Sequence, residues 1–144
     1  MKKYKPMLCI VLTVLVLSCS SCGGLGDQQY SCNVDMVESV QIVELTGFNK
    51  EKLEYEYTVL AEIADYTTFV ERLNNLEQRY AFIGDPAVFE IGYTVIRIDY
   101  FGGDYDLVHN LSYRQVRSGT ITSNGYCRID REQFDALIAD YMPE

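Results

Sequence analysis

The amino-acid sequence predicts an α+β fold, in which two helices pack on one face of a single antiparallel sheet of about five to seven strands. Several segments alternate apolar and polar residues, which is the period of a strand with one buried face. Two other segments carry apolar residues three and four positions apart behind an aspartate, which is typical of a capped helix. The order of the elements is ββα, then about three to five strands, then α, which favours an antiparallel sheet.

The first two strands are expected at residues 37–46 and 53–63. The first is rich in apolar residues, and its alternation slips after Ile42, which indicates a bulge or a strand covered on both faces. The second has the clearest alternation in the chain. Because Tyr55 and Tyr57 share their face of this strand with apolar residues, we expect both tyrosines in the core.

The first helix is expected to begin after Asp65, whose side chain can accept a hydrogen bond from the backbone of the first turn. Its buried stripe consists of the apolar residues at helical spacing, namely Phe69, Val70, Leu73 and Leu76. A short extended run at 78–83 and a turn at 84–86 then lead back to the sheet.

The remaining strands are expected at 94–100, 105–111, 113–116 and 126–129. Gly102-Gly103 lies between the first two of them and predicts a tight hairpin turn. Ser118-Gly119 and Asn124-Gly125 are two further turn signals, of which only one need be a hairpin. The second helix is expected to be capped by Asp130, with Gln133 in the position that completes a capping box.

The N-terminal 22 residues have the composition of an export signal. Three lysines, at positions 2, 3 and 5, precede the apolar run 7–17, which is followed by Cys19 and Cys22. A helix of this length spans about 16 Å, roughly half of a hydrocarbon core of ~30 Å, so we read it as a signal peptide rather than a membrane span. The run Val16-Leu17-Ser18-Cys19 resembles the lipobox of bacterial lipoproteins.

This resemblance implies a diacylglyceryl thioether on Cys19 and cleavage of a signal peptide of residues 1–18. Cys22 is the alternative lipidated residue, because it follows two small residues. Residues 19–35 would form a lipidated flexible tether, and residues 36–144 a single globular domain. The resemblance places that domain on the extracytoplasmic face of a cell membrane, held there through its N-terminal lipid.

Acidic residues dominate the exported part. Without the three lysines of the signal peptide, 9 basic residues face 21 acidic residues, which gives a net charge of −12. This charge disfavours nucleic acid and bare anionic lipid as partners. Glu54, Glu56 and Glu62 alternate along the second strand and could form a docking face for a basic protein, although outward glutamates are often in contact with solvent alone.

Two cysteines remain as candidates for chemistry in the domain. Cys32 and Cys127 could form a disulfide in an oxidising exterior, since cleavage at Cys22 would leave this one pair. Cys127 and His109, the single histidine, could in principle act as a thiol nucleophile and its base, although no motif surrounds either residue.

Three aspartates flank the predicted Gly102-Gly103 turn. Asp99, Asp104 and Asp106 offer oxygen ligands suited to calcium, but their spacing matches no EF-hand loop. The sequence contains no glycine-rich phosphate loop and no recognisable hydrolase or zinc motif, so we expect no cofactor.

These observations favour a binding or accessory module that docks an envelope or secreted protein. An inhibitor or immunity-type lipoprotein that covers a basic cleft of a secreted toxin or hydrolase is the main alternative. A thiol-dependent enzyme that uses Cys127 and His109 is the third hypothesis.

Overall fold

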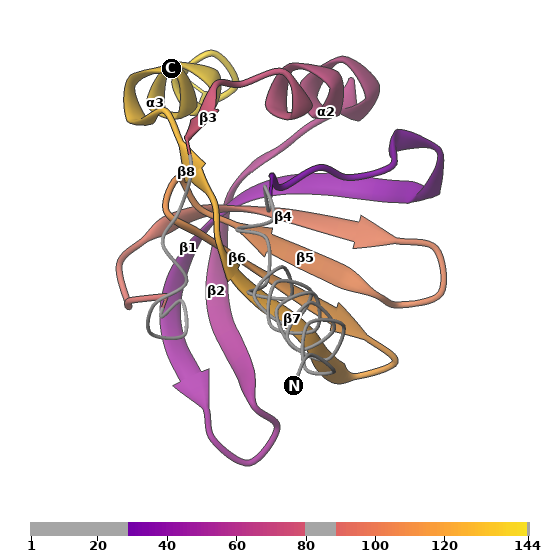
Figure 1. Cartoon of the computed structure of the whole chain (residues 1–144). Coiled ribbons are helices and arrows are strands. Elements are labelled where there is room, and N and C mark those ends of the chain that lie inside the picture. The colour runs from indigo at the N-terminus through magenta and orange to yellow at the C-terminus, as the bar shows by residue number, and fades with distance from the viewer. Residues whose placement is uncertain (1–28, 80–88, 144) are drawn as a thin grey trace, which may run out of the picture.

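The computed structural model describes residues 29–79 and 89–143. In these ranges six strands form one antiparallel sheet in the order β2-β1-β4-β5-β6-β7, and two helices lie next to each other on one side of it (Figure 1). The strands of the sheet are β1 (Val37–Asn49), β2 (Glu54–Glu62), β4 (Thr94–Tyr100), β5 (Tyr105–Val108), β6 (Ser112–Arg117) and β7 (Thr120–Tyr126). The helices are α2 (Tyr66–Asn74) and α3 (Arg131–Ala139). The predicted α+β fold is confirmed.

Three shorter elements lie outside the six-stranded sheet and the two helices. A 3-10 turn, η1 (Val34–Met36), precedes β1. The short strands β3 (Gln78–Arg79) and β8 (Arg128–Ile129) pair antiparallel, so the chain that leaves α2 lies beside the chain that enters α3.

Two hydrophobic clusters lie on opposite faces of the sheet. The larger one, between sheet and helices, includes Ile42, Ile96, Val108, Phe69, Leu73, Phe134 and Leu137. The smaller one, on the other face, consists of Val43, Leu45, Phe89, Val95 and Leu107. Ile42 and Val43 therefore point into different clusters. The predicted slip in alternation arises because β1 is covered on both faces.

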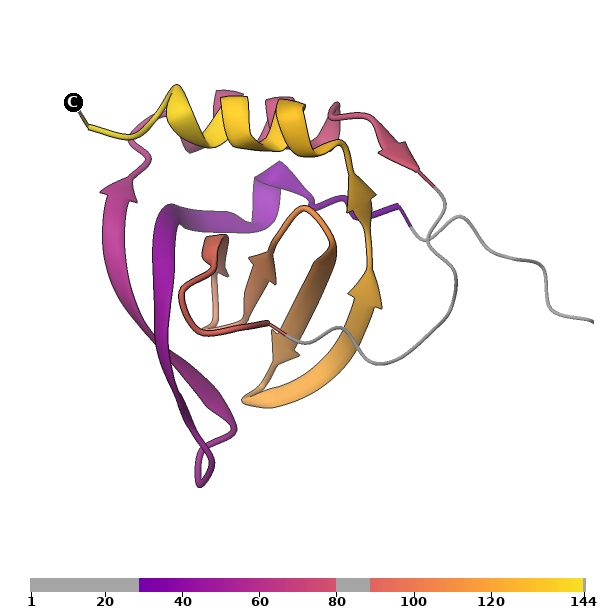
Figure 2. The same cartoon turned by 90° about the vertical axis from the view of Figure 1, so that its left-hand side faces the viewer.

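The face with the smaller cluster is concave. The guanidinium of Arg114 on β6 lies 4.8 Å from the ring centroid of Tyr55 on β2, although β1, β4 and β5 separate these strands in the sheet. In a flat sheet, strands four places apart would be about 19 Å apart. The sheet must therefore curl, as Figure 2 shows, and bring its outer strands toward each other over this face.

The β1–β2 hairpin extends beyond the rest of the sheet. β4 pairs with β1 only as far as Glu44, whereas β1 continues to Asn49. Leu45 still exchanges backbone hydrogen bonds with Gly92 and Tyr93, just before β4, and beyond it β1 and β2 continue as a two-stranded ribbon (lower left in Figure 2). We call residues 45–57 the arm. Thr46 on β1 and Leu60 on β2 are each passed over in the pairing of the two strands, which marks two bulges.

Both predicted helix caps are confirmed, but the predicted capping box is not. The carboxylates of Asp65 and Asp130 accept hydrogen bonds from the backbone N–H groups of Thr68 and Gln133, at 3.2 and 3.1 Å. The Gln133 side chain, however, accepts a hydrogen bond from the Glu77 backbone N–H at 3.0 Å. Gln133 thus joins α3 to the segment before β3 instead of closing its own first turn.

The two late turn signals have different outcomes. Ser118 and Gly119 both have positive φ, 51° and 72°, and form the turn between β6 and β7. Asn124-Gly125 instead lies inside β7. A Cβ at Gly125 would come within 2.5 Å of the Tyr113 ring on the paired strand, so this glycine makes room for an aromatic side chain. The predicted turn at Gly102-Gly103 is confirmed, with φ of 99° and 88°.

The fold begins earlier than the predicted boundary at residue 36. Residues 29–33, which we call the strap, cross the sheet beneath the helices, and Tyr30 and Cys32 are 3% and 9% exposed. The tether prediction for residues 19–35 is therefore wrong for its last part, because these side chains belong to the larger core cluster. Residues 19–28 lie outside the described ranges.

Candidate functional site

The predicted docking face of three glutamates is divided by a bulge. Glu54, Glu56 and Glu62 are all exposed. The pairing passes over Leu60, so the alternation of β2 shifts by one residue between Glu56 and Glu62. This shift turns Glu62 to the face opposite Glu54 and Glu56. The prediction of one face with all three glutamates is therefore wrong.

A different glutamate, just outside the base of the arm, lies on the same side of the ribbon as Glu54 and Glu56. Glu44 on β1 is exposed and pairs with Thr58, which shares its face of β2 with Glu54 and Glu56. Glu56 pairs with Gly47, and a Cβ at this glycine would come within 2.5 Å of the Glu56 carboxylate. Gly47 therefore leaves room for the Glu56 side chain to lie across the ribbon.

The opposite side of the arm carries apolar side chains. Phe48 and Tyr57 are 38% and 36% exposed, and Val59, on β2 just outside the arm, is 41% exposed. Tyr55 is half-buried, with its ring centroid 4.9 Å from that of Phe48 and its hydroxyl donating to the Phe89 carbonyl at 3.2 Å. The prediction that Tyr57 lies in the core is wrong, because Tyr57 stands on the edge strand β2 and is 36% exposed, whereas its partner Leu45 on β1 is fully buried.

Arg97 fixes the base of the arm to the concave face. Its guanidinium lies 5.0 Å from the Tyr57 ring centroid and 4.1 Å from that of Tyr105. Its Nε and Nη2 donate to both carboxylate oxygens of Asp99 at 2.7–3.0 Å. Burial opposes the charge of Arg97, but the hydrogen bonds and charge of Asp99 raise its pKa above the ordinary value. These contacts set the direction in which the Tyr57 ring faces.

The three aspartates proposed for calcium do not converge. Asp99 pairs with Tyr105, so its side chain lies on the concave face, whereas Asp106 is on the helix side of β5. Asp104 accepts a hydrogen bond from the Ser118 backbone N–H at 2.7 Å. Within residues 29–79 and 89–143 no group of three potential ligands is arranged to hold a metal ion.

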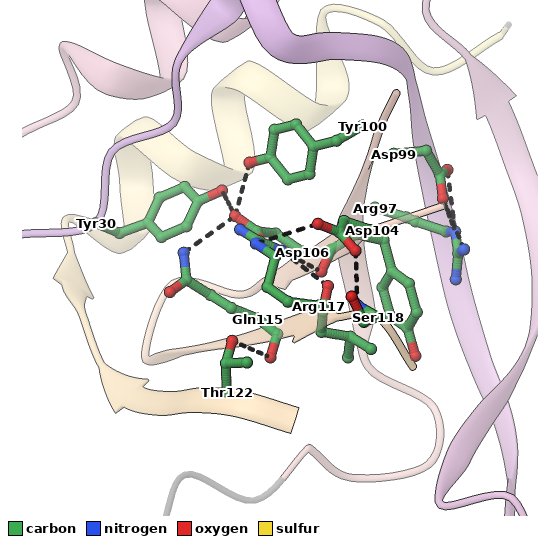
Figure 3. Close-up of polar contacts among 12 residues, drawn as sticks. Tyr30, Arg97, Asp99, Tyr100, Asp104, Asp106, Gln115, Arg117, Ser118 and Thr122 are labelled. Carbon is green, nitrogen blue, oxygen red and sulfur yellow. Dashed lines mark hydrogen bonds and ion pairs between the residues drawn. The ribbon is translucent and has the colours of Figure 1, made fainter. Parts of the chain in front are cut away.

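Asp106 is instead the centre of a buried polar network (Figure 3). It is 0% exposed. Its Oδ2 accepts hydrogen bonds from the hydroxyls of Tyr30 and Tyr100 at 2.8 and 2.7 Å, and from Gln115 Nε2 at 3.4 Å. Its Oδ1 forms an ion pair with Arg117 Nη1 at 2.8 Å. A buried carboxylate requires such partners, because an unpaired charge would be strongly unfavourable there.

The network holds the strap in place together with two amide side chains. Asn74 of α2 accepts from the Cys32 backbone N–H at 3.0 Å and donates to its carbonyl at 2.9 Å. Gln78 of β3 makes the same pair of bonds with Tyr30, at 2.8 and 2.7 Å. Burial, followed by the charge of Asp106, raises the pKa of the Tyr30 and Tyr100 hydroxyls, so both remain donors at neutral pH.

Cys32 and Cys127 are free thiols in the structure, so the predicted disulfide is not formed there. They have different neighbours. Cys127 Sγ donates to the His109 backbone carbonyl at 3.4 Å, whereas Cys32 lies near the Asp106 network. Burial raises the pKa of Cys32 to about 11 and that of Cys127 to about 12. Both groups are therefore protonated at neutral pH, and a thiol is a poor nucleophile.

His109 lines an open cleft at the start of β4. Its ring stacks on that of Tyr93 with centroids 4.5 Å apart, and packs edge-to-face with that of Phe134 with centroids 6.0 Å apart. The cleft lies between α3 and the sheet, has a volume of about 870 Å³, and includes Leu111 and Met142 in its lining. Burial is the main cause of a lowered pKa at His109, so its imidazole is neutral at pH 7. Among the described residues, its buried Nδ1 has no hydrogen-bond partner.

In the proposed Cys127–His109 pair, the thiol is bonded to the backbone carbonyl of His109, while the imidazole packs among aromatic rings. Cys127 is 1% exposed and is not part of the lining of the cleft. This arrangement allows the cleft to bind apolar groups, and it gives the thiol no route to a substrate from that side.

Neither the strap nor the place of Glu44 beside Glu54 and Glu56 was predicted from the sequence. Tyr30 and Cys32 are the aromatic and apolar residues that follow a glycine-rich and polar stretch, and this change of composition could have signalled the start of the fold. Glu44 is the one acidic residue in the apolar run 40–45. Its exposure depends on where the pairing of β4 with β1 ends, and the sequence carries no signal for that position.

Cys19 and Cys22, the two candidate lipidation sites, lie outside the described residues. In the ranges that are described, neither helix has the length and apolar character needed to cross a membrane. No family model, curated protein or solved structure matches this chain.

Proposed function

We propose that this protein is a lipid-anchored, extracytoplasmic binding module of a bacterial cell envelope, and that its arm docks a basic surface of another protein. One observation carries this proposal. The arm projects beyond the sheet with Glu54 and Glu56 exposed on one side, and Phe48 and Tyr57 exposed on the other.

The chemistry of the two sides suits a protein partner. Exposed aromatic and aliphatic side chains supply the area that an interface buries, and tyrosine is enriched at such sites. The glutamates attract lysine and arginine and exclude acidic competitors. The turn carries Lys50, Glu51 and Lys52 and so has mixed charge, whereas the side of the ribbon with Glu44, Glu54 and Glu56 is acidic.

The proposed anchor rests on the lipobox at Val16-Leu17-Ser18-Cys19. Two or three acyl chains would hold a protein far more firmly than one chain, which by itself binds membranes only marginally. The net charge of −12 of the exported part supports a module that stays soluble beside a negatively charged envelope.

Charge reversal on the arm tests the proposal. We expect a variant with Glu54→Lys and Glu56→Lys to lose a crosslinked partner that the parent lipoprotein captures in cells. A matched control with Glu38→Lys and Glu71→Lys makes the same change of charge at exposed positions outside the arm. Captured proteins are quantified by mass spectrometry, and binding to the purified partner is then measured at two salt concentrations.

The arm variant should weaken binding more at low salt than at high salt, because salt screens exposed charges. Tyr57→Ser should weaken it at both salt concentrations, since the loss is then of apolar area. Equal capture by the parent, the arm variants and the control would remove the arm as the docking site.

A further inference from the structure

Two exposed apolar side chains lie together at the end of the domain where β1 begins and β4 ends. Met36 is 51% exposed and Phe101 is 60% exposed. The Phe101 backbone N–H donates to the Met36 carbonyl at 3.2 Å, so the turn after β4 is fixed beside η1. We call these two residues the apolar end. Figure 1 shows this end, at the β4–β5 turn, far from the free end of the arm.

The strap reaches the same end of the domain. Ser31 and Asn33 line a cavity of about 220 Å³ together with Met36 and Phe101. Because Tyr30 and Cys32 are clamped by Asp106, Gln78 and Asn74, the point at which the chain leaves the fold has a fixed position relative to Phe101.

The length of chain before the strap limits how far the domain can move from its anchor. Ten residues, 20–29, separate Cys19 from Tyr30, and a chain of this length spans at most about 36 Å. A domain of this size has a radius of gyration of about 13 Å, so the whole domain stays close to the bilayer. Lipidation at Cys22 would shorten this distance further.

We propose that the apolar end lies against the phospholipid bilayer that holds the anchor, an inference that rests on the proposed lipidation. A short tether gives the patch an effective concentration at the membrane in the millimolar range, so a weak contact is enough to orient the domain. Phenylalanine and methionine side chains gain free energy when they leave water for the acyl boundary.

The contact is apolar rather than electrostatic. The exported part has a net charge of −12, and Asp35 is exposed beside Met36, so anionic lipid opposes the approach of this end. The apolar end should therefore enter zwitterionic phosphatidylcholine more readily than phosphatidylglycerol.

This orientation places the arm and the cleft away from the membrane. The cleft includes Thr94 at the start of β4, about 20 Å along the strand from Phe101. β1 runs antiparallel to β4, so it leads from the apolar end to the arm. A partner that docks the arm would then meet it on the side of the domain that faces outward.

Tryptophan fluorescence in vesicles tests the orientation, because the chain contains no tryptophan. Phe101→Trp is made in the full-length acylated protein, which is reconstituted into phosphatidylcholine vesicles with brominated acyl chains. We expect the tryptophan emission to shift to shorter wavelength and to be quenched by the brominated acyl chains. Met36→Trp provides a second probe of the same end and should behave alike.

Leu111→Trp is the matched control, since Leu111 is 49% exposed but lines the cleft. Its emission should be the same with and without bromine. Equal emission with and without bromine from both probes of the apolar end, in protein that floats with the vesicles, would overturn the orientation and leave the anchor intact. Protein that does not float would overturn both the anchor and the inference.

Discussion

Replacing Tyr30 with phenylalanine tests whether the strap is an integral part of the fold. The change removes the hydroxyl that donates to Asp106 at 2.8 Å and keeps a ring that is 3% exposed. A hydrogen bond to a charged group contributes about 1.5–3 kcal/mol to folding. Asp106 keeps Tyr100 and Arg117 as partners, so we expect Tyr30→Phe to lower the free energy of unfolding by about 1.5–2 kcal/mol.

Alanine at the same position should have a larger effect. The Tyr30 ring packs against Tyr113 with centroids 5.4 Å apart, and its removal leaves a cavity beside the carboxylate. Loss of a buried aromatic ring destabilises by about 3–5 kcal/mol, a large fraction of the roughly 5–15 kcal/mol that holds a domain together.

Urea denaturation of the purified protein, followed by circular dichroism and tyrosine fluorescence, measures these differences. Tyr57→Phe is the control, because its ring is 36% exposed and surface changes stay within about 0.5 kcal/mol. If Tyr30→Phe also stays within about 0.5 kcal/mol of the parent, the bond to Asp106 does not stabilise the fold, and if Tyr30→Ala does so too, the strap is not integral to it.

Two further predictions concern the cysteines and the histidine. At about pH 8, Cys32 and Cys127 should react with iodoacetamide far more slowly in the folded protein than in denaturant, because burial raises the pKa of Cys32 to about 11 and that of Cys127 to about 12. Mass spectrometry of labelled peptides separates the two sites, and rapid native labelling of Cys127 would restore the thiol-enzyme hypothesis. Burial lowers the pKa of His109 below its unfolded value of about 6.5, so the unfolded chain binds this proton more tightly. The resulting stability is present above the unfolded pKa and is lost as pH falls from about 6.5 toward the lower folded value, and His109→Gln should flatten the fall in melting temperature over this window. Equal slopes for parent and variant would contradict the argument.

Local chemistry made part of this fold predictable. The aspartate caps at Asp65 and Asp130 and the Gly102-Gly103 turn depend on residues within a few positions of one another. Such signals keep their meaning in isolation, because a helix start and a tight turn use the same backbone geometry in most surroundings.

Features set by distant residues were not predictable in the same way. Gly125 has the sequence context of a turn, but it lies within β7, where it makes room for the Tyr113 ring on the paired strand β6. Glu62 follows the alternation of β2, yet the bulge at Leu60 moves it to the other face. Tyr30 is held in the core by Asp106, 76 residues later in the chain, which accepts a hydrogen bond from its hydroxyl. In each case the deciding contact joins segments whose proximity exists only in the folded sheet.

The proposed membrane contact and the proposed docking site lie at the two ends of one strand. β1 spans 13 residues, or about 40 Å along its path, and it pairs with β2 on one side and β4 on the other. In its middle part Ile42 is buried in one hydrophobic cluster and Val43 in the other. Separating β1 from its neighbouring strands therefore disrupts both clusters. Elements of this kind open only when the whole domain unfolds, whereas termini and projecting hairpins open more easily. The direction of the arm relative to the apolar end is therefore set by the most protected part of the sheet, and a lipid contact that orients one end also orients the other.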